Sequence, residues 1–115
     1  MKVLDSEKLV RLLDVEARRR KVLTNNLANL DTPGYRAGRV NFTRSLQKYL
    51  SSEDPGEDIG TEVVHPHFDD ADASGNDVTL GREVVALNEN TMRTETFLEF
   101  LKFRKRLTRA AIEGR

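Results

Sequence analysis

Two long segments with helical periodicity lie at the two ends of this 115-residue chain and take up more than half of it. Apolar residues recur at steps of three and four over residues 6–30 and again over residues 79–113, which is the spacing of one helix face. Thr79 is a candidate N-cap and Gly114 a candidate stop signal for the second segment. At about 1.5 Å per residue the first helix alone would be roughly 37 Å long. This length favours a pair of long helices over a compact globule.

The segment between the two helices, residues 31–78, has a different composition. Residues 53–81 hold Asp and Glu but neither Lys nor Arg, and glycine and proline gather there, which is typical of a loop. Residues 41–50 have apolar side chains at helical spacing and predict one short helix before that loop. We expect an all-α fold in a single domain over residues 1–115. Its two terminal helices pack as an antiparallel, coiled-coil-like pair, joined by a loop-rich, partly disordered acidic middle.

The apolar stripes of the two helices are wider than a single partner helix covers. Leu23 and Leu27 belong to the first stripe, Leu98 and Leu101 to the second, and phenylalanines broaden the second stripe further. Oligomerisation is the usual completion of such uncovered apolar faces. A monomeric helical hairpin or small bundle is the other arrangement that the pattern allows, and the periodicity leaves both open.

Composition excludes several classes of function. The formal net charge is +0, so overall charge gives no reason to expect binding to nucleic acid or to an anionic membrane. The chain has no cysteine, which excludes disulfides and thiolate sites, and no apolar run is long enough for a membrane span or a cleavable signal. No serine lies in a nucleophile motif, and no glycine-rich phosphate loop is present. We therefore expect no catalysis, no cofactor and no direct membrane insertion.

Two other clusters were weighed as binding sites. His65, His67 and the aspartates that follow offer metal-ligand groups, but no regular element is predicted to fix their geometry, and we expect an ordinary loop. Basic runs at residues 18–21 and 102–106 resemble phosphate-binding stretches, yet consecutive helical residues point in different directions. We interpret these runs as solvated faces or as partners of acidic residues on neighbouring subunits, with no nucleic acid bound.

The stretch NNLANLDTPGY, residues 25–35, places three asparagines near the end of the first helix. Asparagine is a poor helix former, so this choice lowers helix propensity, while each amide can donate and accept hydrogen bonds. Pro33 and Gly34 suit the central positions of a type II turn, and Asp31 and Tyr35 suit the stabilisation of that turn and of the helix end. These residues allow either an ordinary helix end or a built contact surface.

The segment NLANLDTPGY, residues 26–35, resembles the N-terminal signature of the bacterial flagellar rod and hook family. Three further segments are similar to the short, B-type proteins of the proximal rod: YRAGRVNF over 35–42, HPH over 65–67 and GNDV over 75–78. The C-type short rod subunit shares the asparagine signature but usually has a different sequence after the turn. The resemblance to the B-type proteins covers most of the chain.

This resemblance implies a structural subunit of the proximal rod of the flagellar basal body. It implies that the terminal helices pack together and against neighbouring subunits to form the inner layer of a tube that transmits torque. The implied partners are copies of the chain itself, other rod proteins, and the adaptor and export-gate proteins at the rod base. The implied location is the periplasmic side of the basal body, reached by type III export without a cleavable signal.

The resemblance also assigns the turn to assembly. The implied assembly residues are those of the turn, together with leucines of the two apolar stripes: Asn26, Asn29, Asp31, Thr32, Pro33, Gly34, Tyr35, Leu23, Leu27, Leu98 and Leu101. Replacing Asn26 or Asn29 by alanine is expected to impair assembly more than chain stability. The alternative function is another small helical oligomerisation or adaptor protein with a similar turn, including the other short rod subunit type.

Overall fold

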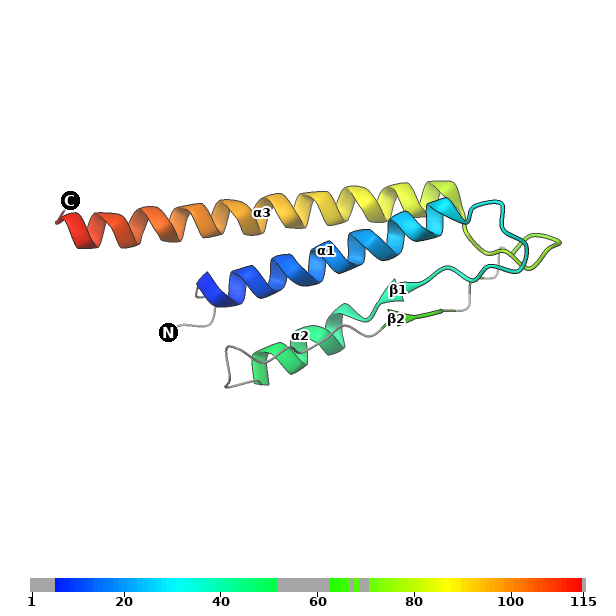
Figure 1. Cartoon of the computed structure of the whole chain (residues 1–115), viewed down its shortest axis with the longest axis horizontal. Coiled ribbons are helices and arrows are strands. Elements are labelled where there is room, and N and C mark those ends of the chain that lie inside the picture. The colour runs from blue at the N-terminus through cyan, green and yellow to red at the C-terminus, as the bar shows by residue number, and fades with distance from the viewer. Residues whose placement is uncertain (1–5, 52–62, 67, 69–70, 115) are drawn as a thin grey trace.

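The structure is a computed structural model that describes residues 6–51, 63–66, 68 and 71–114. Its elements are the helices and strands α1 (Ser6–Ala28), β1 (Arg39–Val40), α2 (Phe42–Ser51), β2 (Val63–Val64) and α3 (Leu80–Glu113). α1 and α3 lie side by side along the long axis, while α2 and the two strands lie on the other side of α1 (Figure 1). The molecule measures 65 × 26 × 18 Å and is therefore elongated.

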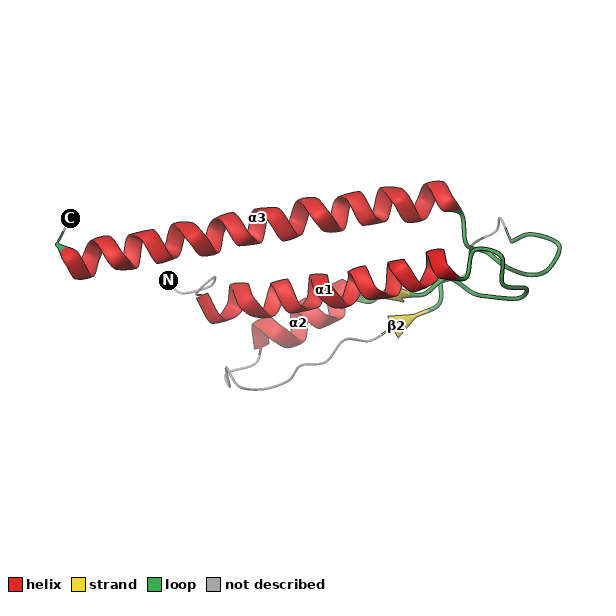
Figure 2. Cartoon of the chain, turned by 45° about the horizontal axis from the view of Figure 1, so that its top comes forward, coloured by secondary structure: helices red, strands yellow, loops and turns green. Residues whose placement is uncertain are grey.

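The two terminal helices run antiparallel, so the predicted helical pair is confirmed (Figure 2). α1 is the central element, because α3 covers one of its sides and β1 with α2 contacts another. Burial of a leucine or valine side chain contributes about 1.5–3 kcal/mol, and most of the buried apolar residues belong to α1. The buried apolar residues among those described are Leu9, Leu12, Val15, Leu23, Ala37 and Val40.

α1 ends at Ala28, two residues before the predicted boundary at residue 30. The next residues leave the helix through a tighter turn, in which the N–H of Leu30 donates to the carbonyl oxygen three residues earlier, that of Leu27, at 3.2 Å. The N–H of Tyr35 then donates to the carbonyl oxygen of Thr32 at 3.3 Å. Gly34 has a φ of 72°, which is the value of the third residue in a type II turn and favours glycine there.

α3 begins and ends where its sequence signals predict. Thr79 is extended, with φ −116° and ψ 122°, and its carbonyl oxygen accepts the N–H of Glu83 at 3.0 Å. The side chain of Thr79 does not cap the helix; its hydroxyl oxygen accepts a hydrogen bond from Arg82 at 3.1 Å. At the other end Gly114 adopts the left-handed conformation, with φ 71°, and its N–H donates to the carbonyl oxygen of Ala110.

The small sheet is the element that the sequence did not predict. β1 and β2 pair antiparallel, with Arg39 opposite Val64 and Val40 opposite Val63. Each strand has only two residues, which is too short for alternating hydrophobicity to indicate a strand. α2 lies where a short helix was predicted. In the acidic middle, residues 52–62, 67, 69 and 70 lie outside the described residues, and the predicted disorder of these residues lies outside them as well.

α3 has apolar side chains on two of its sides. Phe97 and Leu101 lie on the side that faces α1 and are half-buried, and the polar residue Asn90 on the same side is buried. The other side has exposed apolar residues, and no described element covers it (Figures 1 and 2). The last turns of α3 also extend past the first described turn of α1 (Figure 1). We call the uncovered side the outer face of α3 and define it by Met92, Thr96, Phe100, Phe103 and Leu107.

Candidate assembly site at the amide-rich turn

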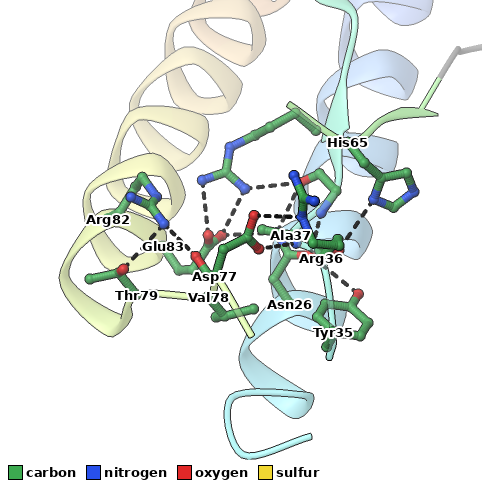
Figure 3. Close-up of polar contacts among 12 residues, drawn as sticks. Asn26, Tyr35, Arg36, Ala37, His65, Asp77, Val78, Thr79, Arg82 and Glu83 are labelled. Carbon is green, nitrogen blue, oxygen red and sulfur yellow. Dashed lines mark hydrogen bonds and ion pairs between the residues drawn. The ribbon is translucent and has the colours of Figure 1, made fainter. Parts of the chain in front are cut away.

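Asn26, in the last turn of α1, is the centre of a polar cluster that joins three segments of the chain (Figure 3). Its side chain is 0% exposed. The amide nitrogen donates to the carbonyl oxygen of Gly38 at 2.9 Å and to Oε2 of Glu83 at 3.0 Å. The amide oxygen accepts the N–H of Gly38 at 2.9 Å and the hydroxyl of Tyr35 at 3.3 Å. The full hydrogen-bonding capacity of this amide is therefore used within the chain.

Glu83 lies in the first turn of α3 and is as fully buried as Asn26. Its carboxylate accepts two hydrogen bonds from the guanidinium of Arg39, at 2.9 Å on Oε1 and 3.1 Å on Oε2. A buried carboxylate without such partners would be destabilising, and the paired geometry of an arginine compensates its charge. The start of α3 is thus attached both to the end of α1 and to β1.

Asp77 holds the segment between the turn and β1. Its carboxylate accepts the N–H of Ala37 at 2.6 Å and the Nε of Arg36 at 2.9 Å, and its own N–H donates to the carbonyl oxygen of Tyr35 at 3.2 Å. Burial by itself raises the pKa of this carboxyl, but the hydrogen bonds from Ala37 and Arg36 outweigh burial and lower the pKa below its ordinary value. Asp77 is therefore an ionised anchor at neutral pH.

Asn76 satisfies carbonyl oxygens just after the end of α1. Its amide nitrogen lies 2.9 Å from the carbonyl oxygen of Asn29, 3.2 Å from that of Leu30 and 2.6 Å from that of Thr32. These carbonyl groups belong to the residues that follow α1, so the amide of Asn76 joins the turn to the segment before α3. The amide oxygen of Asn76 accepts the N–H of Val78 at 2.8 Å, which places the residues just before α3.

The other two asparagines of the opening stretch make local contacts near the surface. Asn29 donates to the carbonyl oxygen of Asn25 at 2.8 Å and accepts the hydroxyl of Thr32 at 3.0 Å. Asn25 donates to the hydroxyl oxygen of Tyr35 at 3.0 Å. The amides near the end of α1 thus have separate roles: Asn26 joins segments in the interior, while Asn25 and Asn29 brace the turn.

A second polar layer joins α1 and α3 farther from the turn. Glu16 of α1 is 0% exposed, and its carboxylate accepts the Nε of Arg93 at 2.5 Å, with Arg19 at 3.5 Å. Asn90, also buried, donates to the backbone oxygen of Glu16 at 2.7 Å. Polar groups inside an apolar helix interface favour the one register in which they meet. Glu16 and Asn90 thus align the two helices along their length.

The sequence comparisons concern the region that contains this cluster. Residues 13–36, which include most of α1 and the turn, match the family model described as "Flagella basal body rod protein". The chain is 32% identical over 95 residues to the flagellar basal body rod protein FlgB of Bacillus subtilis, covering 70% of this chain and 71% of that protein. The chain belongs to the FlgB family of flagellar basal body rod proteins.

Other FlgB proteins are similar over comparable lengths. The FlgB of Borreliella burgdorferi is 29% identical over 102 residues, covering 71% of this chain and 76% of that protein. The FlgB of Salmonella typhimurium is 26% identical over 108 residues, covering 77% of this chain and 78% of that protein. The chain is accordingly a structural protein of the flagellar basal body rod.

The predicted assembly residues of this FlgB-family chain differ in exposure. Asn26 and Leu23 are buried within the chain, and Asn29, Tyr35, Leu27 and Leu101 are half-buried. The exposed members can contact another subunit directly. Asn26 is buried and can affect assembly only by fixing the shape of the turn. A role in assembly stays a prediction for all of them. The exposed members are Asp31, Thr32, Pro33, Gly34 and Leu98.

Several residues of the two polar layers were not predicted from the sequence of this FlgB-family chain. Glu16 has one available signal of a buried ion pair, since it is a charged residue on an apolar line of α1. Asn76 and Asp77 occur in the GNDV segment, where residue type alone does not separate a structural anchor from a solvated loop. Glu83 and Asn90 had no signal beyond their helical spacing.

The histidine loop of this FlgB-family chain has a structural contact in its described part. Nδ1 of His65 lies 3.2 Å from the carbonyl oxygen of Arg36. Within residues 6–51, 63–66, 68 and 71–114, no group of three histidine or acidic side chains is arranged to hold a metal ion. His67, Asp69 and Asp70, which were weighed as ligands, lie outside the described residues.

Proposed function

We propose that this chain assembles through its terminal helices, with copies of itself and with other rod proteins, into the proximal part of the rod. In this role it acts as one rod-type domain of an axial tube that transmits torque, and it performs no catalysis. Membership of the FlgB family supports the basal-body rod as the location. A row of exposed apolar side chains on α3, which no element among the described residues covers, supports assembly as the role.

The observation that carries this proposal is the outer face of α3. Met92 is 66% exposed, Phe100 and Phe103 are each 50% exposed, and Leu107 is 54% exposed. Single exposed apolar residues are common, but a row of large ones along one helix face indicates a contact with another protein. Covering such a row in an assembly removes apolar surface from water, and this is the main driving force for association.

The polar cluster at the turn supports the same role in a different way. A tube that transmits torque requires subunits whose helices keep a fixed relative position. Asn26 and Glu83 fix that position at one end of the helical pair, and Glu16 with Asn90 fixes it farther along. The exposed turn residues Asp31 to Gly34 then form a defined end of the subunit, available for contacts along the rod.

The same function suggests specific partners and a route of delivery. We include the adaptor and export-gate proteins at the rod base among the partners, and delivery by type III export without a cleavable signal, with the assembled chain on the periplasmic side. No helix among the described residues is long and apolar enough to cross a membrane. Direct contacts with the proximal neighbours are to be sought on the exposed turn and on the outer face of α3.

The experiment is a replacement test in the source cells. The native chain is deleted, and the chain or its Phe103→Ser variant is supplied in its place, while basal bodies stripped of hook and filament are purified and analysed by mass spectrometry. We expect the unchanged chain in the basal bodies and restored motility, and a reduced amount of the variant. Val84→Ser, which changes a 42% exposed apolar residue outside the outer face, is the control. Absence of the unchanged chain from intact rods would contradict the proposal.

A further inference from the structure

A groove runs along α1 on a side that α3 does not cover. Ala17, Lys21, Thr24 and Ala28 lie along its length at steps of four, three and four, so they share one helix face. β2 and the turn form the opposite wall, which includes His65. The groove has a volume of about 860 Å³, which is in the range of protein binding pockets.

The α1 side of the groove combines the small residues Ala17, Thr24 and Ala28 with the longer polar side chains of Arg20, Lys21 and Asn25. Gly38 contributes to the floor, where an added Cβ would lie 3.2 Å from Cγ1 of Val22 and 3.3 Å from Cγ1 of Val63. The absence of a side chain at Gly38 therefore lets α1 and the sheet approach each other closely. Small residues on one surface allow large side chains of a partner to enter.

The outer face of α3 presents mainly large apolar side chains. Met92, Thr96, Phe100 and Phe103 line a shallow depression on this face, and large side chains project around it. Residues 92–103 span eleven helical steps, as do residues 17–28 of the groove. At about 1.5 Å per step both surfaces are roughly 16 Å long. The outer face of α3 and the groove are thus matched in length.

Charge is complementary as well. The groove carries Arg20 and Lys21, and the depression on α3 is bordered by Glu95 and Glu99 together with one cation, Arg106. Glu99 pairs with exposed Lys102 at 3.5 Å, while Lys21 and Glu95 have no ion-pair partner among the described residues. Opposite charges on two matching surfaces favour one mutual orientation and suppress others.

The two surfaces of one chain are too far apart to meet. Arg20 of α1 donates to the hydroxyl oxygen of Thr91 at 3.1 Å, and Glu16 contacts Arg93. In this antiparallel register Lys21 lies near residue 90 of α3, whereas Glu95 lies several residues farther along and on the side of α3 away from α1. Any contact between the groove and the outer face therefore joins two copies.

We propose that the outer face of α3 in one copy docks into the α1 groove of a second copy. This inference rests on the proposed function and names the pair of surfaces that would join equal subunits in the rod. Such a contact is heterologous, since each copy uses one surface as donor and the other as acceptor. Heterologous contacts repeat from copy to copy and build rings or helical arrays rather than closed two-fold dimers.

The absence of cysteine from the chain makes site-specific cross-linking a direct test. Thr24 in the groove and Thr96 on the outer face are both exposed, and each hydroxyl donates only to the carbonyl oxygen four residues earlier. Cells that lack the native chain produce a Thr24→Cys chain and a Thr96→Cys chain with different tags. Their basal bodies are purified, oxidised mildly and analysed on a non-reducing gel.

Thr108→Cys is the matched control. Thr108 is also an exposed threonine on α3 whose hydroxyl donates to the carbonyl oxygen four residues earlier. Twelve residues separate it from Thr96, which places it about a third of a turn around the helix. We expect a cross-linked dimer carrying both tags for the Thr24→Cys and Thr96→Cys pair. We expect little or none when Thr108→Cys replaces Thr96→Cys.

Two failures are distinguishable. If both cysteine chains are present in the basal bodies and no dimer forms, or if the control gives the same yield, the docking inference is wrong while the proposed function stands. If the unchanged chain itself is absent from the basal bodies, the proposed function fails and the inference falls with it.

A charge exchange tests the same contact without cross-linking. Lys21→Glu alone and Glu95→Lys alone each place like charges across the proposed contact, so each variant is expected to reduce incorporation into rods. The double variant Lys21→Glu, Glu95→Lys restores opposite charges and is expected to recover most of the incorporation. Two single defects that simply add in the double variant would count against a direct contact between these residues.

Discussion

Asn26 at the end of α1 and Glu83 at the start of α3 are joined by a hydrogen bond of 3.0 Å, although 57 residues separate them in the chain. Both side chains are fully buried. The carboxylate of Glu83 forms an ion pair with Arg39, and the amide of Asn26 makes its remaining hydrogen bonds with Gly38 and Tyr35. An asparagine in the family signature region is thus part of the internal structure of the subunit.

The first prediction concerns Asn26→Ala. The truncation leaves the N–H of Gly38 without its buried partner. It also removes one of the two donors to the carbonyl oxygen of Gly38 and one of the two donors to Oε2 of Glu83, which both keep Arg39. We therefore expect a loss of about 2–3 kcal/mol in the free energy of unfolding. Urea unfolding of the purified chain, followed by circular dichroism, measures this loss. A loss of this size would mean that Asn26→Ala clearly lowers the stability of the chain, whereas the sequence predicts that it impairs assembly more than stability.

Asn25→Ala is the control for this prediction. Asn25 is exposed, and its side chain makes one hydrogen bond, to Tyr35. We expect a loss below about 1 kcal/mol. If the two alanine variants were equally stable, the interior role assigned to Asn26 would be wrong.

The second prediction concerns the polar layer between the long helices. Arg93→Ala removes the closer of two arginines that pair with buried Glu16, leaving Arg19 at 3.5 Å. Because part of the charge remains paired, we expect a loss of about 2 kcal/mol in stability. Lys102→Ala breaks a surface pair with Glu99, whose side chains are 65% and 69% exposed, and should change stability by less than about 0.5 kcal/mol. Thermal and urea unfolding of both variants give the comparison.

The third prediction is a pH dependence that originates at Asp77. Its pKa is lowered in the folded chain, so its stabilising contribution is fully present above the unfolded pKa of about 3.9 and is lost as pH falls toward the folded value. Asp77→Asn removes the titrating group. We expect the difference in unfolding free energy between the unchanged chain and Asp77→Asn to be constant from pH 7 to about pH 5 and to shrink below pH 4. A difference that stayed constant down to pH 3 would refute the anchoring role.

The fourth prediction contrasts two glycines. Gly38→Ala places a Cβ 3.2 Å from Cγ1 of Val22 and 3.3 Å from Cγ1 of Val63, so these packed side chains must shift, and we expect a loss of about 1–3 kcal/mol in the free energy of unfolding. Gly81→Ala meets nothing within 4 Å and lies in α3, where alanine favours the helix, so we expect a gain of up to about 1 kcal/mol. Urea unfolding of the two variants should therefore give changes of opposite sign.

Much of this fold was predictable because long helices leave a repeating signal. The steps of three and four identified both terminal helices, and Thr79 and Gly114 marked the limits of α3 to within a residue. The Pro33-Gly34 turn was also predictable, since its geometry depends on the residues themselves. β1 and β2 were not predictable, because two-residue strands are defined only by their pairing, which joins residues 23 and 25 positions apart in the chain.

The candidate site was predictable only in part. The asparagine-rich turn was identified as the functional region, and the family match over residues 13–36 includes it. The partners of Asn26 were not identified, because Gly38 and Glu83 become neighbours only after α3 returns along α1. The role of Glu16 was likewise missed, since an acidic residue on an apolar stripe has the same appearance whether it is solvated or paired with Arg93.

By itself, then, the sequence determined the two long helices, the turn between residues 32 and 35 and the family to which the chain belongs. All three depend on residues that are close together in the sequence, and the order and spacing of such residues can be read directly from the sequence. The tertiary structure decided which polar residues meet: Asn26 with Glu83, Asp77 with Ala37, and Glu16 with Arg93. It also decided which side of α3 remains uncovered, because burial depends on the register of two helices that local sequence does not specify.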